Sequence, residues 1–149
     1  DLAARPYVHD SYVLVVPASF RLDAPVEWRA LDSLPFIALA CSGAASVLAR
    51  CREAGFSAQP GRTLANETSI AAMVGRGMGY SILPRLATFP APDDVRIVAL
   101  PLPARREFAV VGLHDTMRSQ AAQVVTRFLR DRRVLARTKA FQAGVVGID

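Results

Sequence analysis

The feature that most constrains the fold of this chain is a pair of short, largely apolar runs, which lie among segments with helical spacing. Residues 35–40 read PFIALA, a continuous apolar run of the kind expected of a strand covered on both faces. Residues 80–83 read YSIL and indicate a second buried strand, which Pro84 stops. Strand and helix signals alternate along the chain, so the sequence predicts α/β architecture.

The other elements follow from local patterns. Further strands are expected at residues 11–17, 61–65, 95–100 and 105–114, and helices at residues 44–54, 66–75 and 119–135, with a helical turn within residues 26–33. Gly55 is well placed to end the first helix, and Asn66 to cap the second. The third helix has one apolar face, formed by Ala121, Val124, Val125, Phe128, Leu129 and Leu135. Residues 136–149 have no firm period and are expected to be a tail that is frayed or leads out of the domain.

Composition narrows the class of protein. The 149 residues, 52% of them hydrophobic, suffice for one domain with a real core. No apolar run approaches the roughly 20 residues that span a bilayer, and the N-terminus lacks the layout of a signal peptide. Two cysteines are too few for a disulfide framework, so a reducing cytoplasm is the expected location. The chain begins without Met, which indicates a trimmed or excerpted sequence.

The net charge of +5 invites a nucleic-acid interpretation, but the arginines are scattered. The densest cluster spreads over more than one side of the expected third helix and comprises Arg127, Arg130, Arg132, Arg133 and Arg137. A solvated helix therefore explains the cluster better than a DNA contact.

Two strand-to-helix junctions form the candidate ligand site. Ligands of α/β sheets collect beyond the carboxyl ends of strands, where helix N-termini offer free N–H groups and a positive dipole end. A small carboxylate is a natural guest there, and Gly43 would let it approach the backbone closely. The candidate effector-binding residues are Cys41, Ser42, Gly43, Asn66, Glu67 and Thr68.

Residues 66–84 closely resemble a stretch of LysR-type effector domains, in which a helix is followed by GxGxxxLP and a buried strand. Residues 12–17, 34–37 and 110–115 resemble other strands of that family, in the same order and spacing. The ordered match covers roughly residues 1–132.

The resemblance implies a periplasmic-binding-protein-like (type 2) effector domain, which has two α/β subdomains joined by two crossing strands. Residues 1–135 would be a partial effector-binding domain that contains an essentially complete second subdomain at about 11–100. The crossing strands would be at about 4–9 and 105–113, the returning first-subdomain helix at about 118–135 and a tail at 136–149. Most of the first subdomain and the winged helix-turn-helix would be absent, and with them half of the effector site.

By the same resemblance, this is the effector-sensing and oligomerisation domain of a cytoplasmic LysR-family transcriptional regulator, not an enzyme. It would bind a small metabolite, an organic acid by preference, without a cofactor or a membrane. It would form a homo-oligomer, a dimer or tetramer, and reach DNA only through a winged helix-turn-helix outside these residues.

Two alternatives stay open. The chain could be a truncated self-association module with no competent ligand site, or a small thiol enzyme that uses Cys41. The enzyme would need a base, and the two histidines, His9 and His114, lie on or beside the expected crossing strands. No metal site is expected from two separated histidines without a Cys-x-x-Cys motif.

Two further features receive structural interpretations. Gly75, Gly77 and Gly79 follow a helix and open a strand, which favours a turn over a phosphate loop. Trp28 and Phe20 lie in a polar link and are expected to cover the sheet edge rather than to bind ligand.

Overall fold

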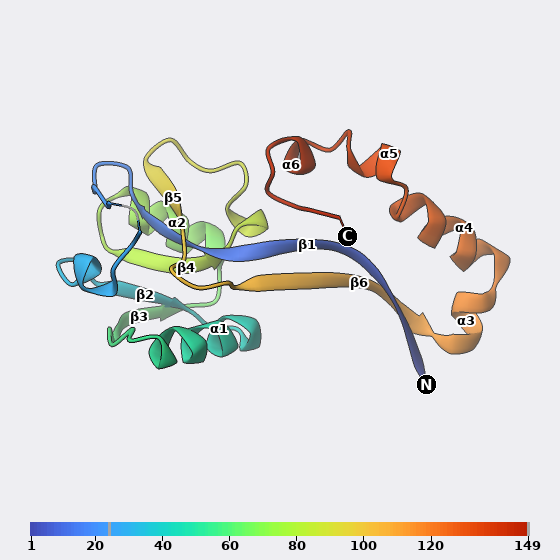
Figure 1. Cartoon of the computed structure of the whole chain (residues 1–149), viewed down its shortest axis with the longest axis horizontal. Coiled ribbons are helices and arrows are strands. Elements are labelled where there is room, and N and C mark those ends of the chain that lie inside the picture. The colour runs from blue at the N-terminus through green and yellow to red at the C-terminus, as the bar shows by residue number, and fades with distance from the viewer. Residues whose placement is uncertain (24, 149) are drawn as a thin grey trace. The chain divides into compact units, whose positions relative to one another are not determined.

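The computed structural model describes residues 1–23 and 25–148. The chain divides into two compact units (Figure 1). We call Ser11–Ala104 the core unit, and Asp1–Asp10 together with the chain from Arg105 onward the terminal unit.

One mixed sheet organises the core unit. Its strands are β1 (Leu2–Pro17), β2 (Phe36–Leu39), β3 (Pro60–Leu64), β4 (Tyr80–Pro84) and β5 (Val95–Ala99), in the order β3-β2-β4-β1-β5. Strand β2 runs parallel to β3 and β4, whereas β1 runs antiparallel to β4 and β5. The helices along this part of the chain are η1 (Trp28–Leu31), α1 (Ser42–Glu53), α2 (Glu67–Gly75) and η2 (Leu86–Thr88). The predicted α/β architecture is therefore confirmed.

The core of this unit lies on both faces of the sheet. Every residue of β2 and β4 is buried, as the two short apolar runs predict. Helix α1 contributes Ala44, Val47 and Cys51 to the buried set, and α2 contributes Ile70, Ala71 and Val74. The predicted turn between α2 and β4 is also confirmed, because Gly77 and Gly79 have φ angles of 75° and 151°, a region that favours glycine.

The terminal unit is built differently. Its elements are the first part of β1, β6 (Arg105–Leu113), α3 (His114–Arg118), α4 (Gln120–Leu129), α5 (Arg132–Leu135) and α6 (Lys139–Gln142), and β6 pairs with β1. The prediction of one helix over residues 119–135 is wrong, because that stretch forms α4 and α5. The Asp131 side chain caps α5 by accepting a hydrogen bond from the Arg133 N–H at 2.8 Å, and a capped start belongs to a new helix.

The apolar face expected on that helix is present but uncovered. No residue of α4 is buried, and Val124, Val125 and Phe128 keep 58%, 55% and 61% of their surface exposed. Periodicity shows that a helix has an apolar stripe, but a second element must lie against the stripe to bury it.

The expectation of a frayed tail is wrong for the described part of residues 136–149. Helix α6 forms there, Val145 is buried, and Gly147 exchanges two backbone hydrogen bonds with His9 of β1, at 2.9 and 2.8 Å. The predicted strands at 4–9 and 11–17 are one continuous strand of 16 residues. The tail has a firm place because β1 offers it a pairing edge.

A buried ion pair ties the two long strands of the terminal unit together. The Asp10 side chain on β1 has no exposed surface and accepts two hydrogen bonds from Arg106 on β6, both at 2.8 Å. Such a bidentate pair holds the two strands in one register. None of the helices in the described part of the chain has the length and hydropathy needed to cross a bilayer.

Candidate functional site: a wall of helix N-termini

The two predicted junctions lie at one edge of the sheet. Strands β2 and β3 are parallel neighbours, and their last residues, Leu39 and Leu64, are partners in the register. Directly beyond them, the Ala40 N–H donates to the Leu64 carbonyl at 2.8 Å. Residues 41–43 and 66–68 therefore both begin at the carboxyl edge, where α/β sheets bind ligands. Their role as ligand contacts stays a prediction.

Each junction begins a capped helix. The Cys41 Sγ accepts a hydrogen bond from the Ala44 N–H at 3.3 Å, and the Asn66 Oδ1 accepts one from the Ser69 N–H at 2.8 Å. Both capping residues have extended backbones, as N-caps do. The prediction that Asn66 caps the second helix is confirmed. The Cys41 Sγ and the Asn66 Oδ1 already accept capping hydrogen bonds. We therefore expect these two side chains to position the helix starts rather than to hold a ligand.

Four backbone donors remain open at these helix starts. Within residues 1–23 and 25–148, the N–H groups of Ser42 and Gly43 on α1 and of Glu67 and Thr68 on α2 donate to no protein acceptor. Of these four residues, Glu67 is half-buried and the other three are exposed. We call these four N–H groups, at the two positive helix ends, the donor wall.

The residues that carry the four N–H groups also bring polar side chains to this edge. The Glu67 carboxylate in the first turn of α2 stabilises the helix dipole but repels a guest of the same charge. Attraction for an anion must therefore come chiefly from the backbone donors. Ser42 and Thr68 add hydroxyl groups, which can donate to a ligand oxygen.

Tyr12 belongs to this edge, although the sequence reasoning did not include it. A Cβ atom added to Gly43 would lie 2.7 Å from the Tyr12 hydroxyl oxygen, so that hydroxyl occupies the space beside the glycine. Tyr12 is 4% exposed and stands on β1, where β1 pairs with the end of β4. Gly43 therefore makes room for a tyrosine, in addition to any ligand. No spacing rule connects residues 12 and 43; only the sheet order does.

The two cysteine thiols differ in their exposure to solvent. Cys41 is exposed at the start of α1, whereas Cys51 is fully buried, and that burial raises the pKa of the Cys51 thiol. Both histidines of the sequence, His9 and His114, belong to the terminal unit, so the core unit that carries Cys41 contains none. In the described residues no three His, Cys, Asp or Glu side chains gather as a metal site would require.

Two hollows share no residue with the donor wall. One, of about 100 Å³, lies in the core unit and is lined by Trp28, Asp32, Phe56 and Tyr80 among others. The other, of about 280 Å³, lies in the terminal unit and is lined by Arg5, Arg118, Arg127 and three uncharged residues. The residues of the donor wall therefore do not line either of these two hollows.

Comparison with known proteins agrees with this architecture. The family described as LysR substrate binding domain matches residues 1–133. LrrA of Synechococcus elongatus, named as a probable HTH-type transcriptional regulator, is 32% identical over 102 residues, which are 65% of this chain and 34% of LrrA.

Solved structures share the fold at lower identity. HinK, a LysR family transcriptional regulator from Pseudomonas aeruginosa, superposes with a TM-score of 0.73 at 19% identity, over 89% of this chain and 48% of HinK. The CcmR regulatory domain of Synechocystis PCC6803, solved in complex with 2-PG, gives a TM-score of 0.72 at 19% identity, over 87% of this chain and 66% of that domain. The predicted periplasmic-binding-protein-like fold is confirmed.

The chain spans about a third of the curated relative and half of HinK. The family match itself covers most of the chain. The chain belongs to the LysR substrate-binding domain family.

Proposed function

We propose that this chain is an effector-sensing domain of a transcriptional regulator and that the donor wall contacts a small anionic metabolite, an organic acid by preference. Binding would shift the arrangement of a homo-oligomer, and with it that of winged helix-turn-helix domains joined to this domain in the whole regulator. The regulator would act in the cytoplasm, and we assign no catalytic role to Cys41.

One observation carries the proposal: four open N–H donors stand at two helix starts on one sheet edge. A helix start attracts anions through both its free N–H groups and its dipole, and two adjacent starts reinforce each other. Membership of a substrate-binding family and the complex of the CcmR domain with 2-PG support a small-molecule guest.

The test removes one donor without disturbing a helix. Ser42 is the first residue of α1, a position where proline is tolerated because its N–H has no helical acceptor. Cys41 has φ −148° and ψ 158°, which suits a residue before proline. The variant Ser42→Pro therefore lacks one N–H, and Ser42→Ala is the control that keeps the N–H and loses the hydroxyl.

Calorimetric titration with a panel of small mono- and dicarboxylates is the measurement. For an acid that binds, we expect Ser42→Pro to lower the affinity about ten-fold, since a hydrogen bond to a charged group contributes about 1.5 kcal/mol or more. Ser42→Ala should bind within a factor of about three of the parent. Equal affinity for the proline and alanine variants, or no binding to any acid, would contradict the proposal.

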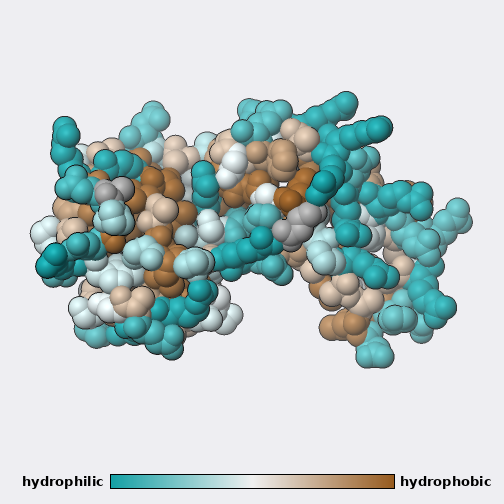
Figure 2. Space-filling view, in the orientation of Figure 1, coloured by the Kyte–Doolittle hydropathy of each residue, from teal (hydrophilic) through white to brown (hydrophobic). Residues whose placement is uncertain are grey.

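A second candidate function, self-association, rests on the terminal unit. Besides the three exposed residues of α4, Leu2, Val111 and Leu113 are 71%, 55% and 61% exposed. Hydrophobic residues interrupt the hydrophilic surface of this unit (Figure 2). Exposed apolar patches mark association surfaces. We propose that a second copy of the chain covers this patch, and sedimentation that shows a monomer at every concentration up to about 1 mM, the weak-binding limit, would refute it.

A further inference from the structure

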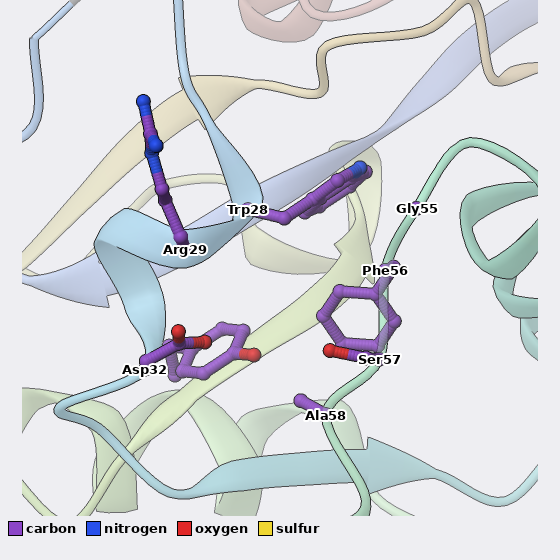
Figure 3. A pocket seen from close by; sticks show the side chains of 8 residues that line it. Trp28, Arg29, Asp32, Gly55, Phe56, Ser57 and Ala58 are labelled. Atoms are coloured by element: carbon purple, nitrogen blue, oxygen red, sulfur yellow. The ribbon is translucent and has the colours of Figure 1, made fainter.

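A small hollow of about 100 Å³ lies between η1 and the loop that follows α1, and none of the features described above uses it (Figure 3). Trp28, Arg29 and Asp32 line it from the η1 side, and Gly55, Phe56, Ser57 and Ala58 from the loop. Tyr80, the first residue of β4, completes the lining. The charged and aromatic part of the lining thus consists of three aromatic residues, the Asp32 carboxylate and Arg29, whose guanidinium is paired with Glu27.

Tyr80 brings an unpaired hydroxyl group to this hollow. The residue is 1% exposed, and its hydroxyl makes no hydrogen bond with any residue of the described chain. Burial, reinforced by the negative charge of Asp32, raises the pKa of Tyr80, so the phenol stays protonated at neutral pH. The hydroxyl oxygen is therefore open to a hydrogen bond with water or with a ligand.

Asp32 supplies the negative charge. Its side chain is exposed and has no cationic partner among residues 1–23 and 25–148. The nearest cation along η1, Arg29, is bound to the Glu27 Oε2 at 2.6 Å, and its guanidinium points away from Asp32 and Ser57 (Figure 3). The carboxylate is therefore available to a guest from solution.

The aromatic rings are held in place. The Trp28 and Phe56 rings meet edge to face with centroids 5.0 Å apart, and the Trp28 Nε1 donates to the Ala54 carbonyl at 3.0 Å. The Phe36 ring contacts both Phe56 and Tyr80, at 5.2 and 5.5 Å between centroids. A fixed aromatic wall beside a carboxylate attracts a cation by its negative ring faces and by direct charge.

We propose that this hollow binds a small organic ammonium ion, with the charged nitrogen near Asp32 and the carbon atoms against the Trp28 and Phe56 rings. The Tyr80 and Ser57 hydroxyl oxygens would accept the remaining N–H groups. A volume of about 100 Å³ admits a guest of only a few heavy atoms. This site is separate in residues and in charge preference from the donor wall, so the two would respond to different molecules.

Trp28 reports on the site directly because it is the single tryptophan of the sequence. We would titrate the 149-residue chain with methylammonium chloride at constant ionic strength and follow Trp28 fluorescence, with sodium chloride and sodium acetate as reference salts. We expect a saturable change with methylammonium and none with either reference salt.

Three variants locate the binding. Asp32→Asn should weaken it about ten-fold, the effect of losing one charge-assisted hydrogen bond. Asp93→Asn removes the same charge from an exposed turn residue outside the hollow and should leave the affinity unchanged. Tyr80→Phe keeps the ring and should weaken binding several-fold, with far-UV circular dichroism to check the fold.

Three results would overturn the proposal. They are no saturable response in the parent chain, an equal response to sodium ions, and an equal loss of affinity in Asp32→Asn and Asp93→Asn. The first would leave ordered water as the partner of the Tyr80 hydroxyl.

Discussion

The core unit and the terminal unit use similar apolar residues with opposite results. In the core unit Leu14, Ile70 and Leu83 are completely buried, because the sheet lies under helices that cover it. In the terminal unit Val125 and Phe128 stand on a helix with a clear apolar stripe and remain more than half exposed. A helix stripe contributes hydrophobic free energy only where another element takes it out of water.

The comparison teaches where each unit gets its stability. The core unit depends on hydrophobic burial, which scales with the apolar area removed from water. The terminal unit has few buried residues, and among them the Asp10 carboxylate with its two hydrogen bonds to Arg106 stands out. Variants in the two units should therefore lower the free energy of unfolding for different reasons and by different amounts.

The largest effect is expected for Ile70→Ala in the core unit. The residue is 0% exposed on α2, so the truncation leaves a cavity and should lower the free energy of unfolding by about 4 kcal/mol. Val124→Ala on α4, at 58% exposure, is the control and should change it by less than about 0.5 kcal/mol. Urea unfolding followed by far-UV circular dichroism measures both; similar losses would show that the stripe of α4 is covered in solution.

A smaller loss in the free energy of unfolding is expected for Arg106→Met in the terminal unit. The change removes both hydrogen bonds that Arg106 donates to the buried Asp10 carboxylate and should lower the free energy of unfolding by about 3 kcal/mol. Arg105→Met removes the same charge from an ion pair with Glu107 whose side chains are 45% and 73% exposed, and should cost less than about 0.5 kcal/mol.

The measurement for this pair uses two probes of urea unfolding. Both residues belong to the terminal unit, whereas Trp28 reports on the core unit. The urea midpoint measured by circular dichroism should therefore shift more than the midpoint measured by Trp28 fluorescence. Equal shifts of the two urea midpoints would show that the units unfold as one.

The smallest change in stability is expected for the double variant Val125→Ser and Phe128→Ser. Both side chains are exposed, so the free energy of unfolding should move by less than about 0.5 kcal/mol. Self-association should nevertheless weaken, because the apolar patch is lost. Sedimentation velocity over a concentration series measures it, and unchanged association would remove α4 from the proposed interface.

Much of the core unit could be predicted from local patterns. Asn66 caps α2 as its amide side chain indicates, Gly55 ends α1 with a φ of 95°, and β2 and β4 are buried along their whole length. These features depend on residues close in the chain, whose steric and hydrogen-bonding preferences act within one turn or one strand. The same rules failed for residues 119–135, where the Asp131 cap begins a new helix at a point that the apolar period does not mark.

By itself, the amino-acid sequence determined the α/β class, the position of most strands, the two helix starts that form the donor wall, and the family to which the chain is similar. Only the tertiary structure placed the Tyr12 hydroxyl beside Gly43, paired Asp10 with Arg106, returned Gly147 to His9, and gathered Trp28, Asp32 and Tyr80 around one hollow. The physical reason is sequence separation. Local elements follow from the conformational preferences of neighbouring residues, whereas contacts between distant residues exist only once strand order and register have brought them together.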